Sequence, residues 1–395
     1  MKTIVLCNGN AGEGGIVRAM IRYANGIYEH GKYNVEILFK DDFSSSGERL
    51  KELNPSIKVH SLNSAKMVDI RNKYRKLRDK NMIAKLVYNL ILPYERYIYN
   101  KEVKKIFNKR DDILVLIDFD MTLWRYLEKV KAYKIGRFSF SLKFGYEKNP
   151  KKKTELIKAY DKLILISKDM IKELNTYYPF AKDKGFHVYN PIDLSKANID
   201  ANNDIELTDF EKGLIKKPYI VSLCRLNKVK GCHEIIEAVK ILRDKGIKIN
   251  FYMVGDGKEK EHLISLIKEY SLEEQIYILG IKRNPFIWLK NAKAFAHASY
   301  GEGLPNVLIE AMAVNTPIVA YDCPTGPNDI LNGGDCGVLV EMGNIAELSK
   351  GIEKVITDEK YSCELKEKMK IRIEDFAVEK SINRMIEMIS EFDKG

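Results

Sequence analysis

The chain has 395 residues, of which 45% are hydrophobic, and it carries a formal net charge of +11. This length is enough for two or three domains with sizeable cores. No run approaches the roughly 20 apolar residues of a membrane span, and the six cysteines show no paired spacing, which argues against a membrane-spanning protein and against a disulfide or zinc framework.

Short aliphatic runs alternate with longer amphipathic runs in the first half of the chain. The first run is too short for a signal peptide, so we expect a cytoplasmic location. Alternation of this kind predicts a parallel sheet that helices cover on both faces. The expected strands are residues 2–7, 34–39, 57–60, 113–117, 136–140, 162–166 and 186–189, and the expected helices are residues 15–30, 94–108 and 167–177.

Residues 69–110 are strongly basic, with 13 Lys/Arg against 4 Asp/Glu and a local net charge of +9. The same window contains five tyrosines and the apolar patch 86–92. Basic residues mixed with tyrosines and aliphatic residues suit the surface of an anionic membrane. A solvated helical face explains them equally well, and no recognition motif supports nucleic acid as a partner.

The polar stretch 195–211 indicates a linker, and a second alternating block follows it. Two doubly wound halves of this kind place a cleft at the carboxyl ends of both sheets. The expected strands of the second block are residues 219–223, 249–254, 276–279, 294–298 and 317–321. The expected helices are residues 232–245, 258–270, 285–291, 306–314, 345–357, 364–376 and 378–392.

The segment 298–331 is the most informative part of the sequence. Its turn, residues 301–305, lies between an apolar run and an apparent helix, and Pro305 suits the first helical position. Unpaired amides and the helix dipole make such a turn an anion site. Glu302 and Glu310 would repel a phosphate, so we expect their carboxylates to accept hydrogen bonds from sugar hydroxyls. A surface turn followed by a solvated helical face is the alternative.

Two further loops carry residues that suit a bound diphosphate. Residues 8–15 follow the first strand, and the adjacent glycines Gly14 and Gly15 let backbone amides approach an anion closely. A plain tight turn is the alternative, and the spacing is not that of a dinucleotide site, so no cofactor is expected. In the loop that opens the second block, Arg225 and Lys230 can neutralise a diphosphate leaving group, although two solvated basic residues would look the same.

Residues 118–122, Asp-Phe-Asp-Met-Thr, fit the D-x-D-x-T signature of haloacid-dehalogenase phosphatases and are the strongest competing signal. Phosphatase chemistry of that type also needs a later lysine and an acidic pair that binds magnesium, and its motif normally follows the first strand. Here the motif lies in the middle of a domain, so polar residues at a strand end are the better explanation. The six histidines have no partners at metal-like spacing, and no metal site is expected.

Glu302 and Glu310, with seven residues between them in GEGLPNVLIEAMA, resemble the hallmark of the retaining glycosyltransferases of family 4, the glycosyl transferases group 1. The segment from Arg225 to Gly231 is similar to the family's G-R-L…K-G segment, with Cys224 where the family usually has glycine. Similar matches extend over nearly all of the chain.

This resemblance implies an α/β fold of GT-B architecture, with two doubly wound Rossmann-like domains facing a central cleft. Residues 1–195 would form an N-terminal acceptor-binding domain, and residues 196–377 a C-terminal domain that binds the nucleotide sugar. Residues 378–395 would form a helix that crosses back to the N-terminal domain.

The resemblance also implies roles for individual residues. Glu302, Arg225 and Lys230 would be the catalytic residues. Front-face attack, in which the leaving phosphate oxygen deprotonates the acceptor hydroxyl, requires no protein base, metal or cofactor. This agrees with residues 138–143, where many family members have a histidine and this chain has none. The residues implied to bind the nucleotide sugar are Gly14, Gly15, Arg225, Lys230, Glu302, Gly303, Leu304, Pro305, Asn306 and Glu310.

The implied function is transfer of a sugar from a nucleotide sugar, a UDP-sugar in our interpretation, to a glycan acceptor. We expect that acceptor to be a polyprenyl-diphosphate-linked saccharide in bacterial surface polysaccharide assembly. The protein would act in the cytoplasm or peripherally at the inner face of the cell membrane. Two alternatives remain open, namely a UDP-sugar 2-epimerase on the same fold and a non-catalytic glycosyltransferase partner subunit.

Overall fold

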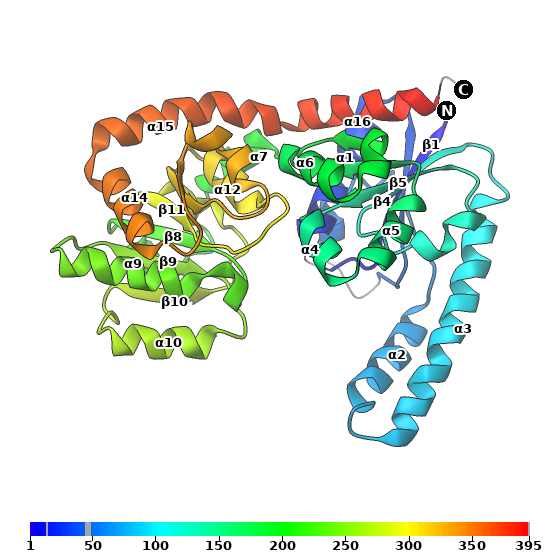
Figure 1. Ribbon diagram of the computed structural model, residues 1–395, viewed down its shortest axis with the longest axis horizontal. Helices are drawn as coiled ribbons and strands as arrows, with labels where there is room; N and C mark the ends of the chain where they lie inside the picture. Colours follow the sequence, from blue (N-terminus) through cyan, green and yellow to red (C-terminus); the bar gives the residue numbers. More distant parts are fainter. Residues whose placement is uncertain (13–14, 44–48, 394–395) are drawn as a thin grey trace. The chain divides into compact units, whose positions relative to one another are not determined.

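The computed structural model of the chain describes residues 1–12, 15–43 and 49–393 and separates into two compact units (Figure 1). The first unit comprises Met1–Ile166, Met170–Pro191 and the C-terminal segment from Val378, and the second comprises Ser167–Asp169 and Ile192–Ala377. Each unit contains its own parallel sheet, as the alternating sequence pattern predicts. Across the described ranges, no helix is both long enough and apolar enough to cross a membrane.

The first unit contains a seven-stranded parallel sheet in the order β3-β2-β1-β4-β5-β6-β7. Its central strands β1 (Thr3–Asn8) and β4 (Ile113–Asp118) are buried along their whole length, as in sheets that helices cover on both faces. The strand order reverses between β1 and β4, so the loops that follow these strands meet at one edge of the sheet. The other strands are β2 (Asn34–Phe39), β3 (Lys58–Ser61), β5 (Tyr133–Phe138), β6 (Lys162–Leu165) and β7 (Gly185–His187).

Helices α1 (Gly15–His30) and α16 (Val378–Phe392) lie side by side in the first unit (Figure 1). Gly26 permits their close contact, because a Cβ atom at this position would lie 2.5 Å from Cγ1 of Ile382. The C-terminal helix is therefore a structural part of the first unit. The remaining helices are α2 (Ala65–Leu77), α3 (Met82–Phe107), α4 (Leu142–Lys148), α5 (Pro150–Lys158) and α6 (Lys168–Tyr177).

Helices α2 and α3 form a hairpin that extends away from the sheet of the first unit (Figure 1). Helix α3 begins at Met82, earlier than the sequence pattern predicts, because the side chain of Asn81 accepts hydrogen bonds from the amides of Ile83 and Ala84. The helix continues through Pro93 to Phe107. The basic window of the sequence thus forms an extended two-helix projection.

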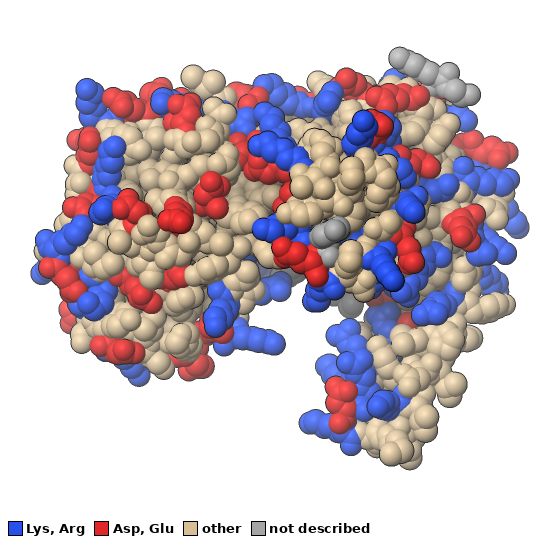
Figure 2. All heavy atoms as spheres, in the orientation of Figure 1, with Lys and Arg blue, Asp and Glu red and all other residues tan. Residues whose placement is uncertain are grey.

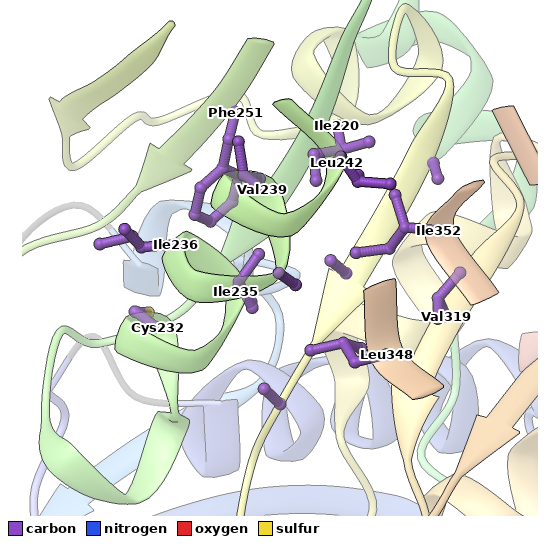
Figure 3. Packing of buried hydrophobic residues seen from close by; sticks show 14 of the residues in the cluster. Ile220, Cys232, Ile235, Ile236, Val239, Leu242, Phe251, Val319, Leu348 and Ile352 are labelled. Carbon is purple, nitrogen blue, oxygen red and sulfur yellow. The ribbon is translucent and has the colours of Figure 1, made fainter. Parts of the chain in front are cut away.

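The second unit contains a six-stranded parallel sheet in the order β10-β9-β8-β11-β12-β13. Helices α9 (Cys232–Asp244) and α14 (Ile345–Thr357) contribute to its main hydrophobic core, where Leu242, Ile352 and Leu348 lie close to Ile220 and Val319 of the sheet (Figure 3). The strands are β8 (Tyr219–Leu223), β9 (Asn250–Val254), β10 (Ile276–Gly280), β11 (Ala294–His297), β12 (Ile318–Tyr321) and β13 (Val338–Val340). The other helices are α7 (Leu194–Ala201), α8 (Asp209–Leu214), α10 (Lys260–Glu269), α11 (Phe286–Lys290), α12 (Asn306–Ala313), α13 (Pro327–Ile330) and α15 (Glu359–Arg372).

The stretch 195–211 is not a structureless linker, and the sequence interpretation of this stretch is wrong. It contains most of α7, which Asp193 caps by accepting a hydrogen bond from the amide of Lys196. It also contains the start of α8, where Thr208 and Glu211 form a reciprocal capping box. Capping by polar side chains explains the misreading, because a run of polar residues is also typical of linkers.

Candidate active site

Three neighbouring strands of the second sheet, β8, β11 and β12, direct their following loops to the same edge. The three strands pair in parallel, and the strand order reverses between β8 and β11. Ligands of open α/β sheets bind outside the carboxyl ends of the strands at such a reversal. The loops are residues 224–231, 298–305 and 322–326, and the first two contain the glutamate and basic residues that the sequence singled out.

Loop 224–231 lies directly against loop 298–305. The amide of Tyr300 donates to the carbonyl of Val229 at 2.8 Å. Gly231 has a φ of 60°, and a Cβ atom there would lie 2.1 Å from the carbonyl oxygen of Ala298. Glycine fits this position without strain or collision, and its close contact places Lys230 beside the loop that follows β11.

Lys230 and Glu302 meet at this edge of the sheet. The Nζ atom of Lys230 donates to Oε1 of Glu302, and Nε2 of His297 lies 3.2 Å from the same oxygen. Burial alone would raise the pKa of Glu302, but His297 and Lys230 outweigh burial and lower the pKa to about 2. The buried carboxylate is therefore ionised at neutral pH, and it can only accept hydrogen bonds.

Loop 322–326 holds the turn that contains Glu302. The amide of Glu302 donates to the carbonyl of Pro324 at 2.9 Å, and the amide of Thr325 donates to the carbonyl of Glu302 at 3.2 Å. A Cβ atom on Gly326 would lie 2.7 Å from Cδ of Pro305. The turn that follows β11 is thus held in place by the loop that follows the neighbouring strand β12.

Helix α12 begins at Asn306, two residues after the buried turn residues Gly303 and Leu304. Pro305 is the N-cap of this helix, with a φ of −69° and a ψ of 98°. The prediction that Pro305 occupies the first helical position is therefore wrong by one residue, because its ψ is extended. Glu310 is buried in the second turn of the same helix, so one short segment carries both glutamates.

Arg225 lies on the same loop as Lys230, but its side chain is exposed, whereas that of Lys230 is paired with Glu302. The backbone at Arg225 is shaped by the glycine turn after β9. The amide of Leu226 donates to the carbonyl of Asp256 at 2.9 Å, and a Cβ atom on Gly255 would lie 1.8 Å from the carbonyl oxygen of Cys224. This turn has a structural role in setting the path of the loop.

The glycine loop of the first unit follows β1, at the strand-order reversal of the first sheet. Gly14 lies outside the residues that the structure describes, and Gly15 is the exposed first residue of α1. The carboxylate of Asp120 shapes the start of this loop by accepting a hydrogen bond from the amide of Gly9 at 2.9 Å.

Asp118 is fully buried at the end of β4, and its carboxylate is enclosed by donors of its own chain. It accepts hydrogen bonds from the amides of Thr122 at 3.1 Å and Leu123 at 2.8 Å, and from the hydroxyl of Tyr160 at 2.7 Å. Burial and the neighbouring Asp120 raise the pKa of Asp118 to about 7. A carboxylate held in this way shapes a strand end, in agreement with the structural interpretation of the D-x-D-x-T motif.

Within the described ranges, no group of three candidate ligand side chains could hold a metal ion.

The sequence did not predict the contacts of two buried residues, His297 and Arg137. His297 is the last residue of β11, and its contact with Glu302 is not predicted. Its position five residues before Glu302 is the signal in the sequence. Arg137, in β5, is buried, and it donates to Oγ of Ser139 at 2.6 Å and to Oδ1 of Asn190. Burial lowers the pKa of Arg137 to about 10, and an arginine inside an apolar strand is the signal for it.

Known proteins resemble this chain in sequence and in fold. Residues 204–374 match the family model of the glycosyl transferases group 1. An uncharacterised glycosyltransferase of Methanocaldococcus jannaschii is 28% identical over 287 residues, which are 69% of this chain and 68% of that protein. The N-acetylgalactosamine-N,N'-diacetylbacillosaminyl-diphospho-undecaprenol 4-alpha-N-acetylgalactosaminyltransferase of Campylobacter jejuni is 31% identical over 216 residues. That match covers 55% of this chain and 56% of the Campylobacter protein.

Among solved structures, Anabaena HepE in complex with UDP has a TM-score of 0.74 and 16% sequence identity, with 99% of this chain and 100% of that chain covered. At this identity the likeness shows the fold, which is the GT-B fold of two Rossmann-like units. The family match lies within the second unit, where Lys230 and Glu302 are joined. The chain is therefore a glycosyltransferase of the GT-B fold, and residues 204–374 of its second unit match the glycosyl transferases group 1.

Proposed function

We propose that the chain is a retaining glycosyltransferase that moves a sugar from a UDP-sugar to a polyprenyl-diphosphate-linked saccharide at the cytoplasmic face of the membrane. The observation that carries this proposal is the buried, ionised Glu302 joined to Lys230 at the strand-order reversal of the second unit. Two relatives support it: HepE was solved with UDP, and the name of the Campylobacter enzyme specifies an α linkage and a saccharide on diphospho-undecaprenol.

Glu302 would bind hydroxyls of the donor sugar. Its pKa of about 2 keeps the carboxylate charged, and hydrogen bonds to a charged, buried acceptor are stronger than those to neutral groups. The amides of Gly303 and Leu304, just before α12, would add donors for the sugar and the diphosphate. Glu310, buried in the second turn of α12, would accept hydrogen bonds from the ribose hydroxyls.

Lys230 and Arg225 would stabilise the leaving diphosphate. Negative charge develops on the diphosphate oxygen as the bond to the sugar breaks, so a cation fixed beside the donor sugar lowers the barrier. Lys230 is held in place by Glu302, while Arg225 extends from the same loop and would contact the diphosphate from the solvent side.

Retention would follow from front-face attack. The acceptor oxygen forms its new bond to the anomeric carbon on the side from which the diphosphate leaves, and the leaving oxygen takes the acceptor proton. No protein base is then needed. This agrees with residues 138–143, the region where many family members have a histidine and this chain has none.

A transfer assay on the full chain tests this proposal. UDP-glucose, UDP-galactose and their N-acetyl forms would be offered one at a time with undecaprenyl-diphosphate-linked saccharides. We expect UDP release that depends on acceptor, a lipid product heavier by one sugar, and an α linkage by NMR. A β linkage would contradict retention. Consumption of the donor without acceptor would favour the 2-epimerase alternative, and UDP binding without any product would favour the partner subunit.

A further inference from the structure

The tip of the α2–α3 hairpin, residues 75–90, exposes large apolar side chains that a folded protein normally buries. Met82, Ile83, Leu86 and Leu90 are each between 60% and 80% exposed, and Leu77 is 40% exposed. Exposed apolar residues are common when scattered, but a contiguous group of them marks a binding surface.

These residues follow the helical repeat of α3. Ile83, Leu86 and Leu90 are three and four residues apart, and Tyr94 and Tyr97 continue the same spacing with more than half of each side chain exposed. At about 1.5 Å per residue, the stripe from Ile83 to Tyr97 is about 21 Å long. We call this surface the exposed stripe.

A second apolar set on α3 is already used inside the first unit. Ala84, Ile91, Tyr99, Val103 and Phe107 are buried, and they lie on the side of the helix away from the exposed stripe. Helix α3 therefore has two apolar faces, and packing of its own unit accounts for one. The exposed stripe is left without a comparable role in the packing of the unit.

Positive charge lies beside the exposed stripe. The tip contains five Lys/Arg residues and a single Asp, and the basic side chains are exposed. Figure 2 shows Lys and Arg atoms along one side of the hairpin and uncharged atoms along its other side and at its tip. The basic residues of the tip are Arg75, Lys76, Arg78, Lys80 and Lys85.

A buried polar network fixes the root of the hairpin to the rest of the first unit. Both terminal nitrogens of Arg71 donate to the carboxylate of Asp41, at 2.9 and 2.7 Å, and one of them also donates to Glu95 at 3.2 Å. The hydroxyl of Tyr99 donates to Asp41 at 3.1 Å, and Asn63 donates to Glu95 at 2.8 Å. The tip is thus presented on a firmly anchored base.

We propose that the tip of the α2–α3 hairpin docks on an anionic lipid bilayer. The exposed stripe would enter the boundary between headgroups and acyl chains, and the five basic residues would contact anionic headgroups. An anionic bilayer supplies an apolar layer directly beneath a negatively charged one, which matches both features of the tip. A nucleic acid would match the charge but leave the apolar side chains in water.

Vesicle co-sedimentation of the full chain tests this docking. Phosphatidylcholine vesicles with and without phosphatidylglycerol would be compared at low and high salt. We expect binding to the phosphatidylglycerol vesicles, weakened by salt, and a loss of at least tenfold in the variant Ile83→Ser/Leu86→Ser/Leu90→Ser. The variant Lys76→Gln/Lys80→Gln/Lys85→Gln should lose the preference for anionic vesicles.

Matched control variants change equally exposed residues of the second unit. Ile205→Ser/Ile371→Ser and Lys216→Gln/Lys217→Gln should bind vesicles as the unchanged protein does. Unaltered binding by the two hairpin variants would overturn the proposal. A dimer in solution that the apolar variant converts to monomer would also overturn it, because the occupant of the stripe would then be a second copy.

This docking does not depend on the proposed transfer reaction. Each variant would also be tested for its thermal midpoint and its thermal shift with UDP, which report on folding and on the donor site. Loss of vesicle binding with an unchanged UDP response locates the defect in the hairpin. Vesicle binding without any response to UDP would contradict the proposed function and leave the docking intact.

Discussion

At the scale of single residues, the electrostatics of the site centre on Glu302. A buried carboxylate is costly unless it is paired, and here Lys230 and His297 both contact one of its oxygens. The pairing keeps the carboxylate charged. The same arrangement links the site to protein stability, since the pKa of Glu302 is lowered to about 2.

The substitution Glu302→Gln should therefore destabilise the protein in a pH-dependent manner. A lowered pKa means that the carboxylate stabilises the fold fully above its unfolded pKa of about 4.5, and that this contribution is lost as the pH falls toward 2. The difference in stability should be on the order of 3 kcal/mol near neutral pH. Thermal midpoints of both proteins between pH 7 and pH 3 measure it, and a difference that stays constant would contradict the assigned pKa.

Asp118→Asn should show the opposite pH trend. Burial and Asp120 raise the pKa of Asp118 to about 7, so the folded protein retains a proton that the unfolded chain releases above pH 4. The contribution of Asp118 to stability therefore falls as the pH rises from about 4 to 7. The asparagine variant should be less stable throughout, because the amide of Leu123 loses its acceptor, but it should lack this decline. Thermal midpoints at pH 5 and pH 7 would decide, and an equal decline in both proteins would contradict the assignment.

At the scale of elements, glycines set the paths of the loops that carry charge. The loop after β8 reaches Glu302 because Gly231 lets its backbone approach the carbonyl of Ala298. The turn after β9 approaches the same loop through Gly255. In both cases a glycine, which has no side chain, allows the close backbone contact that sets the path of the loop with the charged residues.

Gly231→Ala should displace Lys230 and weaken UDP binding. The new Cβ atom would lie 2.1 Å from the oxygen of Ala298, at a φ of 60° that is itself unfavourable for alanine. Gly246→Ala is the matched control, since Gly246 has a φ of 83° and open space around it. Both variants should lose about 1 kcal/mol of stability from backbone strain, and Gly231→Ala should lose more because its Cβ atom collides with Ala298. UDP affinity measured by calorimetry should fall in Gly231→Ala alone. Equal UDP affinity in the two variants would contradict the role of this contact.

The root of the α2–α3 hairpin should depend strongly on Arg71. Its removal takes away the cation that pairs with both Asp41 and Glu95, and burial already raises the pKa of Glu95. Arg71→Ala should therefore cost about 3 kcal/mol of unfolding free energy. Arg75→Ala, at an exposed position of the same helix, should change the thermal midpoint little. Similar midpoints for the two variants would show that the network contributes nothing.

The sequence predicts the strands and the central loops better than it predicts the hairpin. Strands such as β1 and β8 are buried along their whole length and appear in the sequence as short, mostly apolar runs. Helix α3 was predicted only in part, because its two apolar faces blur the helical period and Pro93 interrupts it.

The candidate site could be predicted as residues but not as contacts. The motifs around Glu302, Glu310, Arg225 and Lys230, through their resemblance to a known family, mark these residues in the sequence. The contact between Lys230 and Glu302 depends on strand order and on the fit of Gly231 against Ala298, which are tertiary features. The contact of His297 with Glu302 is likewise set by packing at the end of β11.

At the scale of the whole molecule, two surfaces with different tasks lie in different units. The hairpin tip belongs to the first unit and concentrates exposed apolar and basic residues. The paired Lys230 and Glu302 belong to the second unit, which matches the glycosyl transferases group 1. Membrane binding and donor binding should therefore respond to separate sets of substitutions.

Calorimetric titration of UDP into the full chain, Lys230→Ala and Lys228→Ala tests the central claim most directly. Lys228 is the matched control, because it is an exposed lysine two residues away on the same loop. A charge-assisted contact is worth about 1.5–3 kcal/mol, so Lys230→Ala should bind UDP at least tenfold more weakly, and Lys228→Ala should bind as the unchanged protein does. Equal affinities for Lys230→Ala and the unchanged protein, or no UDP binding by any of the three, would contradict the assignment of the donor site.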